Sequence, residues 1–246
     1  MVVYSPFGEL HGNFFPASYC AILANPTWKK RLHKVHTSDS LPRGDRRWCE
    51  LDSCNSSDAL LMNVFACAEA LADGRLASLL GVDMKQPEFG FKARVPLLEG
   101  KFDRTEVDMR LGDLLVEAKL TEADFQSKSK AFVDRYRDFE GVFRRRDLPQ
   151  SKTRYSCYQL IRNVLAAYAL NCSFCVMLDA RRPDLLEQWY AVMRCVKIAD
   201  LRLRCKVLTW QELSEALPVK LQAFLEEKYG IKPGPLTPYE FQHLQQ

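Results

Sequence analysis

The sequence predicts an α/β fold in which helices cover a mixed β-sheet. A helical pattern between Ser56 and about Asp73 precedes three strand candidates, and helices and strands then alternate toward the C-terminus. The order of helix, three strands, helix, strand, helix, strand and helix is typical of a sheet with parallel and antiparallel neighbours and with helices packed on it.

The first helix of the predicted core has a clear start. Ser56, Ser57 and Asp58 are residue types that cap helix N-termini. Apolar residues then recur at the i, i+3, i+4 spacing of one helix face as far as Leu71. Gly74 is the expected stop, and the pattern resumes over residues 75–80.

Three strands and further elements follow. The strand candidates span 89–97, 105–111 and 114–120, and Gly112-Asp113 between the last two predicts a type II′ hairpin. The remaining predicted elements are helices at 125–142, 155–170, 185–196, 210–217 and 218–230, and strands at 173–179 and 203–208. These elements predict an irregular extension over residues 1–55 packed on the core, a domain over 56–230 and a loose tail over 231–246.

The composition is that of a globular protein. Of the 246 residues, 47% are hydrophobic and 27% are charged. No apolar run is long enough for a membrane span, and no charged leader with an apolar stretch opens the chain. Several of the nine cysteines sit within apolar patterns, as reduced thiols do in the cytoplasm. We therefore expect a cytoplasmic protein without a membrane partner, and the oligomeric state, a homodimer included, stays open.

The charges are unevenly distributed although the net charge is only +4. Basic residues dominate Lys29–Arg47 and Ser127–Arg154, whereas acidic residues dominate Lys101–Gln126 between them. Two basic zones around an acidic centre suit a polyanionic ligand whose chemistry occurs at the acidic part. The alternative is a mixed surface that water simply solvates.

The predicted hairpin places its charged residues on one face. With a two-residue loop, Asp108 lies opposite Glu117, and Glu106 lies opposite Lys119. Side chains alternate along a strand, so the apolar residues of both strands share the other face, which must be the core face. We expect the four charged side chains to point away from the interior.

Two carboxylates in that arrangement repel each other unless a cation, a proton or water offsets the repulsion. Mg²⁺ is commonly held by one or two protein carboxylates together with phosphate oxygens of a substrate. Lys119, beside Glu117 on the same face, has an ammonium that would orient water or offset phosphate charge. The alternative is an exposed polar face with a Glu106–Lys119 pair and a screened contact between Asp108 and Glu117.

These residues resemble the Asp…Glu-x-Lys signature of the PD-(D/E)xK, or restriction-endonuclease-like, nuclease superfamily. Its core has the same order of helix, three strands, helix and strand. Three segments are more narrowly similar to a bacterial branch of restriction-endonuclease-like proteins: Ser56–Leu60 with Asn63, Glu117–Glu122, and Gln159–Asn163. The resemblance covers about residues 56–213, with Val107 at the position of the signature's proline.

The resemblance implies a set of site residues. Asp108 and Glu117 would bind Mg²⁺ or Mn²⁺, the Ala118 carbonyl would join them, and Lys119 would position the attacking water. Gln159 would approach this catalytic site from the following helix, where Tyr155, Gln159, Arg162 and Asn163 form a polar stripe. The accessory candidates are Glu69, Glu106 and Glu122. The candidates for nucleic-acid binding are Arg162, Asn163, Arg144, Arg145 and Arg146.

The sequence thus predicts a metal-dependent nuclease that hydrolyses DNA phosphodiester bonds. A catalytically inactive nuclease fold that serves as a nucleic-acid-binding or interaction module is the alternative. A third interpretation is an enzyme acting on another phosphate ester. On the first interpretation, Asp108→Ala or Lys119→Ala abolishes cleavage and leaves the fold intact.

Overall fold

The computed structural model describes residue 4 and residues 6–35 and 49–234. The chain divides into two compact units, which are described separately. Of the described residues, the first contains those up to Phe89 together with 210–234, and the second contains Gly90–Thr209. These units differ from the predicted division at 55/56 and 230/231, because residues from both ends of the chain pack within the first unit.

The first unit is mainly helical. Its helices are α1 (Pro16–Ala24), α2 (Pro26–Lys29), α3 (Ser57–Phe65), α4 (Ala68–Ala72), α5 (Gly74–Leu80), α11 (Trp210–Ser214) and α12 (Val219–Tyr229), with 3-10 turns at Lys30–His33 and Glu50–Asp52 and short strands β1 (Pro6–Phe7) and β2 (Leu10–His11). The aromatic rings of Phe15 and Phe224 lie 5.8 Å apart. Such contacts join the N-terminal and C-terminal segments of this unit.

The helix predicted over residues 56–73 is interrupted. Ser56 caps it as expected, by accepting a hydrogen bond from the Ala59 N–H, but α3 ends at Phe65 and the chain is extended at Cys67. Gly74 starts α5 rather than stopping a helix. The reason is local: the Asp73 carboxylate accepts a hydrogen bond from the Arg75 N–H and so caps a new helix.

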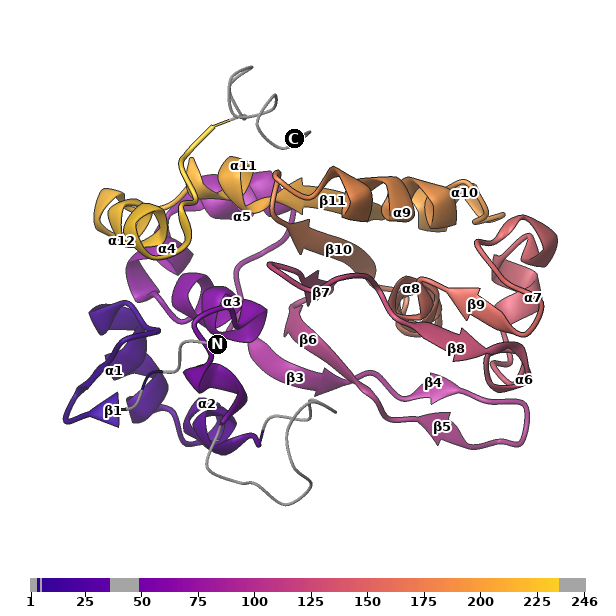
Figure 1. Ribbon diagram of the computed structural model, residues 1–246, viewed down its shortest axis with the longest axis horizontal. Coiled ribbons are helices and arrows are strands. Elements are labelled where there is room, and N and C mark those ends of the chain that lie inside the picture. The colour runs from indigo at the N-terminus through magenta and orange to yellow at the C-terminus, as the bar shows by residue number, and fades with distance from the viewer. Residues whose placement is uncertain (1–3, 5, 36–48, 235–246) are drawn as a thin grey trace. The chain divides into compact units, whose positions relative to one another are not determined.

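The second unit contains most of a five-stranded sheet with the order β11-β10-β7-β6-β3 (Figure 1). The strands are β3 (Glu88–Lys92), β6 (Glu106–Leu111), β7 (Leu114–Ala118), β10 (Ser173–Leu178) and β11 (Cys205–Thr209). β6 and β7 are antiparallel, whereas β7, β10 and β11 are parallel. The helices of this unit include α8 (Tyr158–Leu170), α9 (Pro183–Met193) and α10 (Ala199–Leu203). The predicted α/β class with a mixed, helix-flanked sheet is confirmed.

The hairpin between β6 and β7 has the predicted register. Leu111 pairs with Leu114 and Met109 pairs with Val116. Gly112 has a φ of 58°, which a residue with a side chain rarely adopts and which the first central position of a type II′ turn requires. The local sequence therefore determined this turn.

The expected open polar face of the hairpin is wrong for β7. Every residue of β7 is buried, and Leu115 packs in a core cluster with residues of α8, α9 and β10. β7 is a central strand between β6 and β10, and parallel strands in such a position are usually covered on both faces. Glu117 and Lys119 are consequently buried rather than solvent-exposed.

The single helix predicted over residues 125–142 is also wrong. This segment contains β8 (Ser127–Ser129) and two one-turn helices, α6 (Lys130–Val133) and α7 (Phe139–Val142). β8 pairs antiparallel with β9 (Arg154–Ser156), with Lys128 opposite Tyr155. Residues that the local pattern assigned to a helix thus form a strand, because they pair with β9, which is distant in sequence. Since β9 extends to Ser156, α8 starts only at Tyr158.

The strand predicted over residues 89–97 divides in a similar way. β3 ends at Lys92, and β4 (Val95–Pro96) pairs with β5 (Phe102–Asp103). Arg94 between them has a φ of 52°, so the chain changes direction there.

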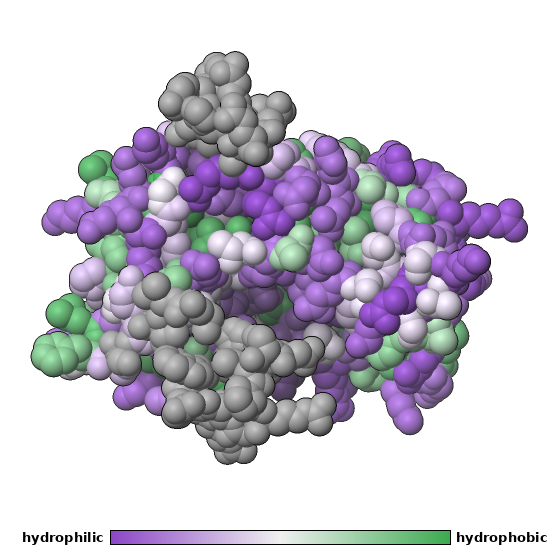
Figure 2. Space-filling view, viewed as in Figure 1, coloured by the Kyte–Doolittle hydropathy of each residue, from purple (hydrophilic) through white to green (hydrophobic). Residues whose placement is uncertain are grey.

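All nine cysteines lie in the described part of the chain and are free thiols there. Within that part no helix is long and apolar enough to cross a bilayer. The face seen in Figure 2 is mostly hydrophilic, with hydrophobic side chains in small separate groups.

Candidate active site

A buried carboxylate lies at the end of β7 with a cation and an amide on either side of it. Glu117 Oε1 accepts a hydrogen bond from Lys119 Nζ at 2.9 Å, and Glu117 Oε2 accepts one from Asn163 Nδ2 at 2.7 Å. Only 1% of Glu117 and 5% of Lys119 is exposed. A buried charge is tolerated only when it is paired and hydrogen-bonded, and both carboxylate oxygens of Glu117 meet that condition. We call Asp108, Glu117, Lys119 and Asn163 the acid cluster.

Asp108 enters the cluster through the backbone of the neighbouring strand. The paired register of β6 and β7 extends to Met109–Val116, and Asp108 is the residue just before it. Its Oδ2 accepts a hydrogen bond from the Ala118 N–H at 2.7 Å, and its side chain is half-buried. The printed pairs do not include Asp108 and Glu117, so their predicted opposition stays a prediction. Asp108 lies against the peptide that links Glu117 to Ala118.

The Lys119 ammonium lies among three acids. Burial lowers the pKa of Lys119, but the nearby charges of Glu117, Asp108 and Glu122 outweigh burial and hold the pKa above its ordinary value of 10.5. Lys119 Nζ also lies 5.6 Å from the centre of the Phe125 ring. The ammonium therefore stays charged near neutral pH, so it can donate hydrogen bonds but cannot take up a proton.

Helix α8 positions both acids of the cluster. Asn163 binds Glu117 directly, and its neighbour Arg162 donates hydrogen bonds to the carbonyl oxygens of Thr105 and Glu106, each at 2.8 Å. Those carbonyls begin β6 just before Asp108. Arg162 is 1% exposed. The expected phosphate-binding role of Arg162 and Asn163 therefore does not fit their positions, because both side chains are buried and bonded to the sheet.

Within the described part of the chain, two amide oxygens on the same helix have no hydrogen-bond partner. Gln159 Oε1 and Asn163 Oδ1 are both buried and unbonded. The two residues are four apart, so their side chains lie on one face of α8. Unsatisfied buried acceptors cost free energy and often mark the place of a water molecule or ion. Gln159 is thus expected on the same face of α8 as Asn163, and its approach to the site stays a prediction.

The accessory candidates are distributed over both units. Glu122 Oε2 accepts a hydrogen bond from the Leu120 N–H at 2.7 Å, and Glu122 contributes to the charge around Lys119. Glu106 is half-buried at the start of β6. Glu69 is exposed on α4 of the first unit. Arg144, Arg145 and Arg146 lie in a loop between α7 and β9.

The first basic zone, Lys29–Arg47, lies partly outside the described residues, which omit 36–48. Of its described part, Arg31 forms an ion pair with Asp58 at 2.6 Å within the first unit.

Sequence patterns did not predict a second hydrogen-bond network, which lies around Asp103 in the segment before β6. The Tyr136 hydroxyl donates to Asp103 Oδ2 and lies 2.8 Å from the Tyr158 hydroxyl, and the Thr105 N–H and hydroxyl donate to Asp103 Oδ1. This network fixes the segment that precedes β6. Its members are up to 55 residues apart in sequence, so no local signal could have identified it.

The same network shifts the pKa of its members in opposite directions. Burial and the hydrogen bond to Asp103 raise the pKa of Tyr136 above its ordinary value of 10.0. Burial raises the pKa of Asp103, but hydrogen bonds from Thr105 and Tyr136 outweigh burial and hold it below the ordinary 3.8. The pair is therefore a charged acceptor and a neutral donor at neutral pH.

The donor atoms near Asp108 are suited to a hard cation. Two carboxylates, the neighbouring backbone carbonyl of Ala118 and the unbonded amide oxygens are all oxygen ligands, the type that Mg²⁺ prefers. Among the residues that the structure describes, no three or more His, Cys, Asp or Glu side chains form a metal-binding group. Two carboxylates are nevertheless the usual protein contribution to a magnesium site that also uses substrate phosphate.

A mixed sheet whose antiparallel hairpin ends in Asp108 and Glu117-Ala118-Lys119, with a helix bonded to the glutamate, is a restriction-endonuclease-like fold. The family model described as "Restriction Endonuclease associating with ARP" matches residues 2–230, and the chain belongs to this family. The resemblance found from the motifs is thereby confirmed. No curated protein and no solved structure matches the chain.

Proposed function

We propose that this protein is a metal-dependent nuclease that hydrolyses DNA phosphodiester bonds at the acid cluster. The observation that supports the proposal most is the position of Lys119 and Asp108 around the buried Glu117, on a hairpin of the register that the motif requires. Membership of a restriction-endonuclease family supports the same reaction class.

The residues fit a bound Mg²⁺ or Mn²⁺. Asp108, Glu117 and the Ala118 carbonyl would hold the ion, which would supply Lewis-acid activation of water and phosphate. Asn163 keeps the Glu117 carboxylate oriented, in the way that outer hydrogen bonds commonly orient metal-binding carboxylates. Arg162 keeps the start of β6, and with it Asp108, in place.

Lys119 would act as a hydrogen-bond donor in the reaction. Its charged ammonium would orient the attacking water and offset negative charge that develops on the phosphate. Gln159 and Asn163 offer unbonded amide oxygens on the same helix face, which are acceptors for the protons of that water.

The test is cleavage of supercoiled and linear DNA with Mg²⁺ or Mn²⁺ and with a chelator. We expect metal-dependent cleavage that Asp108→Asn reduces by about 100-fold or more. Asp113→Asn is the matched control, because Asp113 is an exposed carboxylate in the turn of the same hairpin. Metal-dependent cleavage by Asp108→Asn at the wild-type rate would contradict the proposal.

A specific observation favours a second candidate, a catalytically inactive binding or interaction module. Both oxygens of Glu117 are already bonded, and a lysine ammonium occupies one of them. The family description also names an association, with ARP, which for this chain is a proposal. Calorimetric titration with Mn²⁺ separates the candidates: a nuclease binds the ion and Asp108→Asn weakens binding, whereas an inactive module gives no heat at this site.

A further inference from the structure

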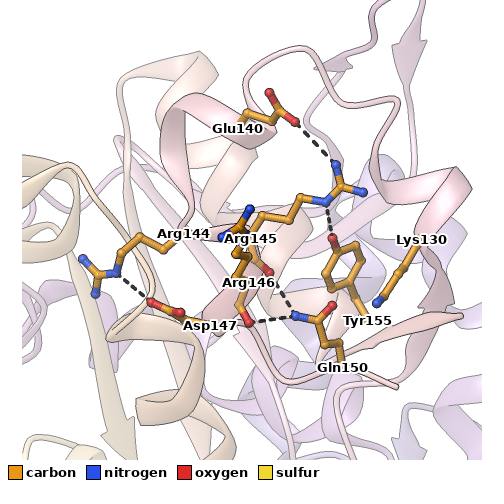
Figure 3. A pocket seen from close by; sticks show the side chains of 8 residues that line it. All are labelled: Lys130, Glu140, Arg144, Arg145, Arg146, Asp147, Gln150 and Tyr155. Atoms are coloured by element: carbon orange, nitrogen blue, oxygen red, sulfur yellow. Dashed lines mark hydrogen bonds and ion pairs between the residues drawn. The ribbon is translucent and has the colours of Figure 1, made fainter. Parts of the chain in front are cut away.

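The loop between α7 and β9 lines a pocket that contains an excess of positive charge. The pocket has a volume of about 730 Å³ and is lined by residues that include Lys130, Arg144, Arg145, Arg146, Gln150 and Tyr155 (Figure 3). We call it the basic pocket. It shares no residue with the acid cluster, and both belong to the second unit.

Two of its arginines are neutralised by neighbouring acids. Arg144 forms an ion pair with Asp147 at 3.2 Å, and Arg145 forms ion pairs with Asp134 at 2.7 Å and with Glu140 at 3.4 Å. Figure 3 shows the side chains of Arg144 and Arg145 extending in opposite directions from the loop. Both acids that line the pocket, Glu140 and Asp147, therefore take part in ion pairs with these arginines.

Lys130 and Arg146 are the other two cations that line the pocket. Among the described residues neither side chain forms an ion pair. Lys130 Nζ lies 5.5 Å from the centre of the Tyr155 ring, and Arg146 is exposed. The pocket therefore contains one exposed and one half-buried cation outside these ion pairs.

Hydrogen bonds hold the loop between α7 and β9 in a defined conformation. Gln150 Nε2 donates to the carbonyl oxygens of Arg145 and Arg146, each at 3.0 Å. Arg145 Nε donates to the hydroxyl of the buried Tyr155 at 2.8 Å. A loop that is already ordered loses less conformational entropy when a ligand binds, so these bonds favour ligand binding at the pocket.

We propose that the basic pocket binds a phosphate monoester through Lys130 and Arg146. A terminal phosphate is largely dianionic near neutral pH and balances the charges of these two cations, and arginine and lysine are the side chains that bind phosphate most readily. The volume lies within the range of small-ligand pockets and admits a nucleotide. The Tyr155 ring is buried beneath Lys130, so its face is not available to stack on a base.

Two sources supply this chemical group: the terminal phosphate of a nucleic-acid strand and a free nucleotide. Phosphate binding at the pocket stands independently of DNA cleavage. Only the strand-end source rests on the proposed nuclease function.

The experiment measures binding by the full chain in the presence of a chelator, which prevents cleavage. Fluorescence anisotropy compares a short single-stranded oligonucleotide carrying a 5′-phosphate with the same oligonucleotide carrying a 5′-hydroxyl. Calorimetry compares AMP with adenosine. We expect the phosphate to tighten binding by about tenfold in at least one arm, and the arm that responds identifies the source.

Matched variants locate the effect. Lys130→Gln combined with Arg146→Gln is expected to remove the preference for phosphate, whereas Arg202→Gln, which removes an exposed charge on α10, is expected to retain it. The proposal is overturned if the wild type shows no phosphate preference in either arm, or if the preference survives in the double variant.

Asp108→Asn separates this proposal from the nuclease proposal. If the pocket binds phosphate as proposed, this variant keeps the phosphate preference whether or not the wild type cleaves DNA. A wild type that prefers phosphate but never cleaves DNA would contradict the nuclease proposal and support the pocket.

Discussion

The acid cluster and the basic pocket belong to the same compact unit but differ in how far their charged side chains are buried. In the acid cluster, Glu117 and Lys119 are buried and bonded to each other. In the basic pocket, Arg146 is exposed and has no ion pair within the described part of the chain. Burial makes an unpaired charge very costly, whereas water stabilises an exposed one. The cluster's charges are therefore part of the fold, and the pocket's charges are available to a ligand.

The largest expected effect is on the buried pair. Lys119→Met leaves the Glu117 carboxylate buried without its cation and should lower the free energy of unfolding by about 3–5 kcal/mol, measured by urea denaturation. This outcome differs from the expectation that substituting Lys119 leaves the fold intact, because that expectation assumed an exposed side chain.

The double variant Glu117→Gln with Lys119→Met is the control for this prediction. It removes both charges, so we expect it to recover much of the lost stability. A loss below about 1 kcal/mol for Lys119→Met alone would mean that the pair behaves like a surface ion pair, and the comparison would fail.

The next effect concerns the amide that orients Glu117. Asn163→Ala removes the donor to Glu117 Oε2 and should cost about 1–3 kcal/mol of stability. If the cluster cleaves DNA, the rate should fall by about 10- to 100-fold as well. Gln86→Ala, at an exposed amide, should change neither quantity. A fall in rate for both variants would show that the effect is not specific to the cluster.

The Tyr136–Asp103 network gives stability a dependence on pH. The pKa of Tyr136 is raised in the folded state, so its contribution is complete below its ordinary pKa of 10.0 and is lost as the pH rises above it. The pKa of Asp103 is lowered, so its contribution is complete above 3.8 and is lost as the pH falls below it. We expect Tyr136→Phe to reduce the alkaline loss of stability in urea denaturation series at rising pH.

Tyr190→Phe provides the control for this pH dependence, because Tyr190 is 59% exposed. It should leave the alkaline loss unchanged. An alkaline loss that is the same in Tyr136→Phe and in the wild type would exclude Tyr136 as its source.

The smallest effect is expected in the basic pocket. Arg146→Gln removes an exposed charge without an ion pair and should shift the melting temperature by less than about 2 °C, as monitored by differential scanning fluorimetry. A loss of stability comparable to that of Lys119→Met would show that the pocket's cations hold the fold together, and the distinction between the two regions would disappear.

Local sequence accounts for the parts of the site that depend on neighbours in the chain. The turn at Gly112-Asp113 determined the pairing of Met109 with Val116, and the Glu117-Ala118-Lys119 motif begins on the second strand of this hairpin. Segment 125–142 was misassigned because the pairing of Lys128 with Tyr155 overrides its helical pattern. The bond from Asn163 to Glu117 spans 46 residues, and nothing local predicts it.

The sequence by itself determined the class of fold, the register of the hairpin and the identity of the acids and the lysine on it. These properties follow from side-chain alternation and from a turn that only a few residue types can form. Only the tertiary structure decided that Glu117 and Lys119 are buried, and that Arg162 supports a strand instead of facing solvent. Burial depends on which distant element covers a face, and that choice results from packing the whole unit.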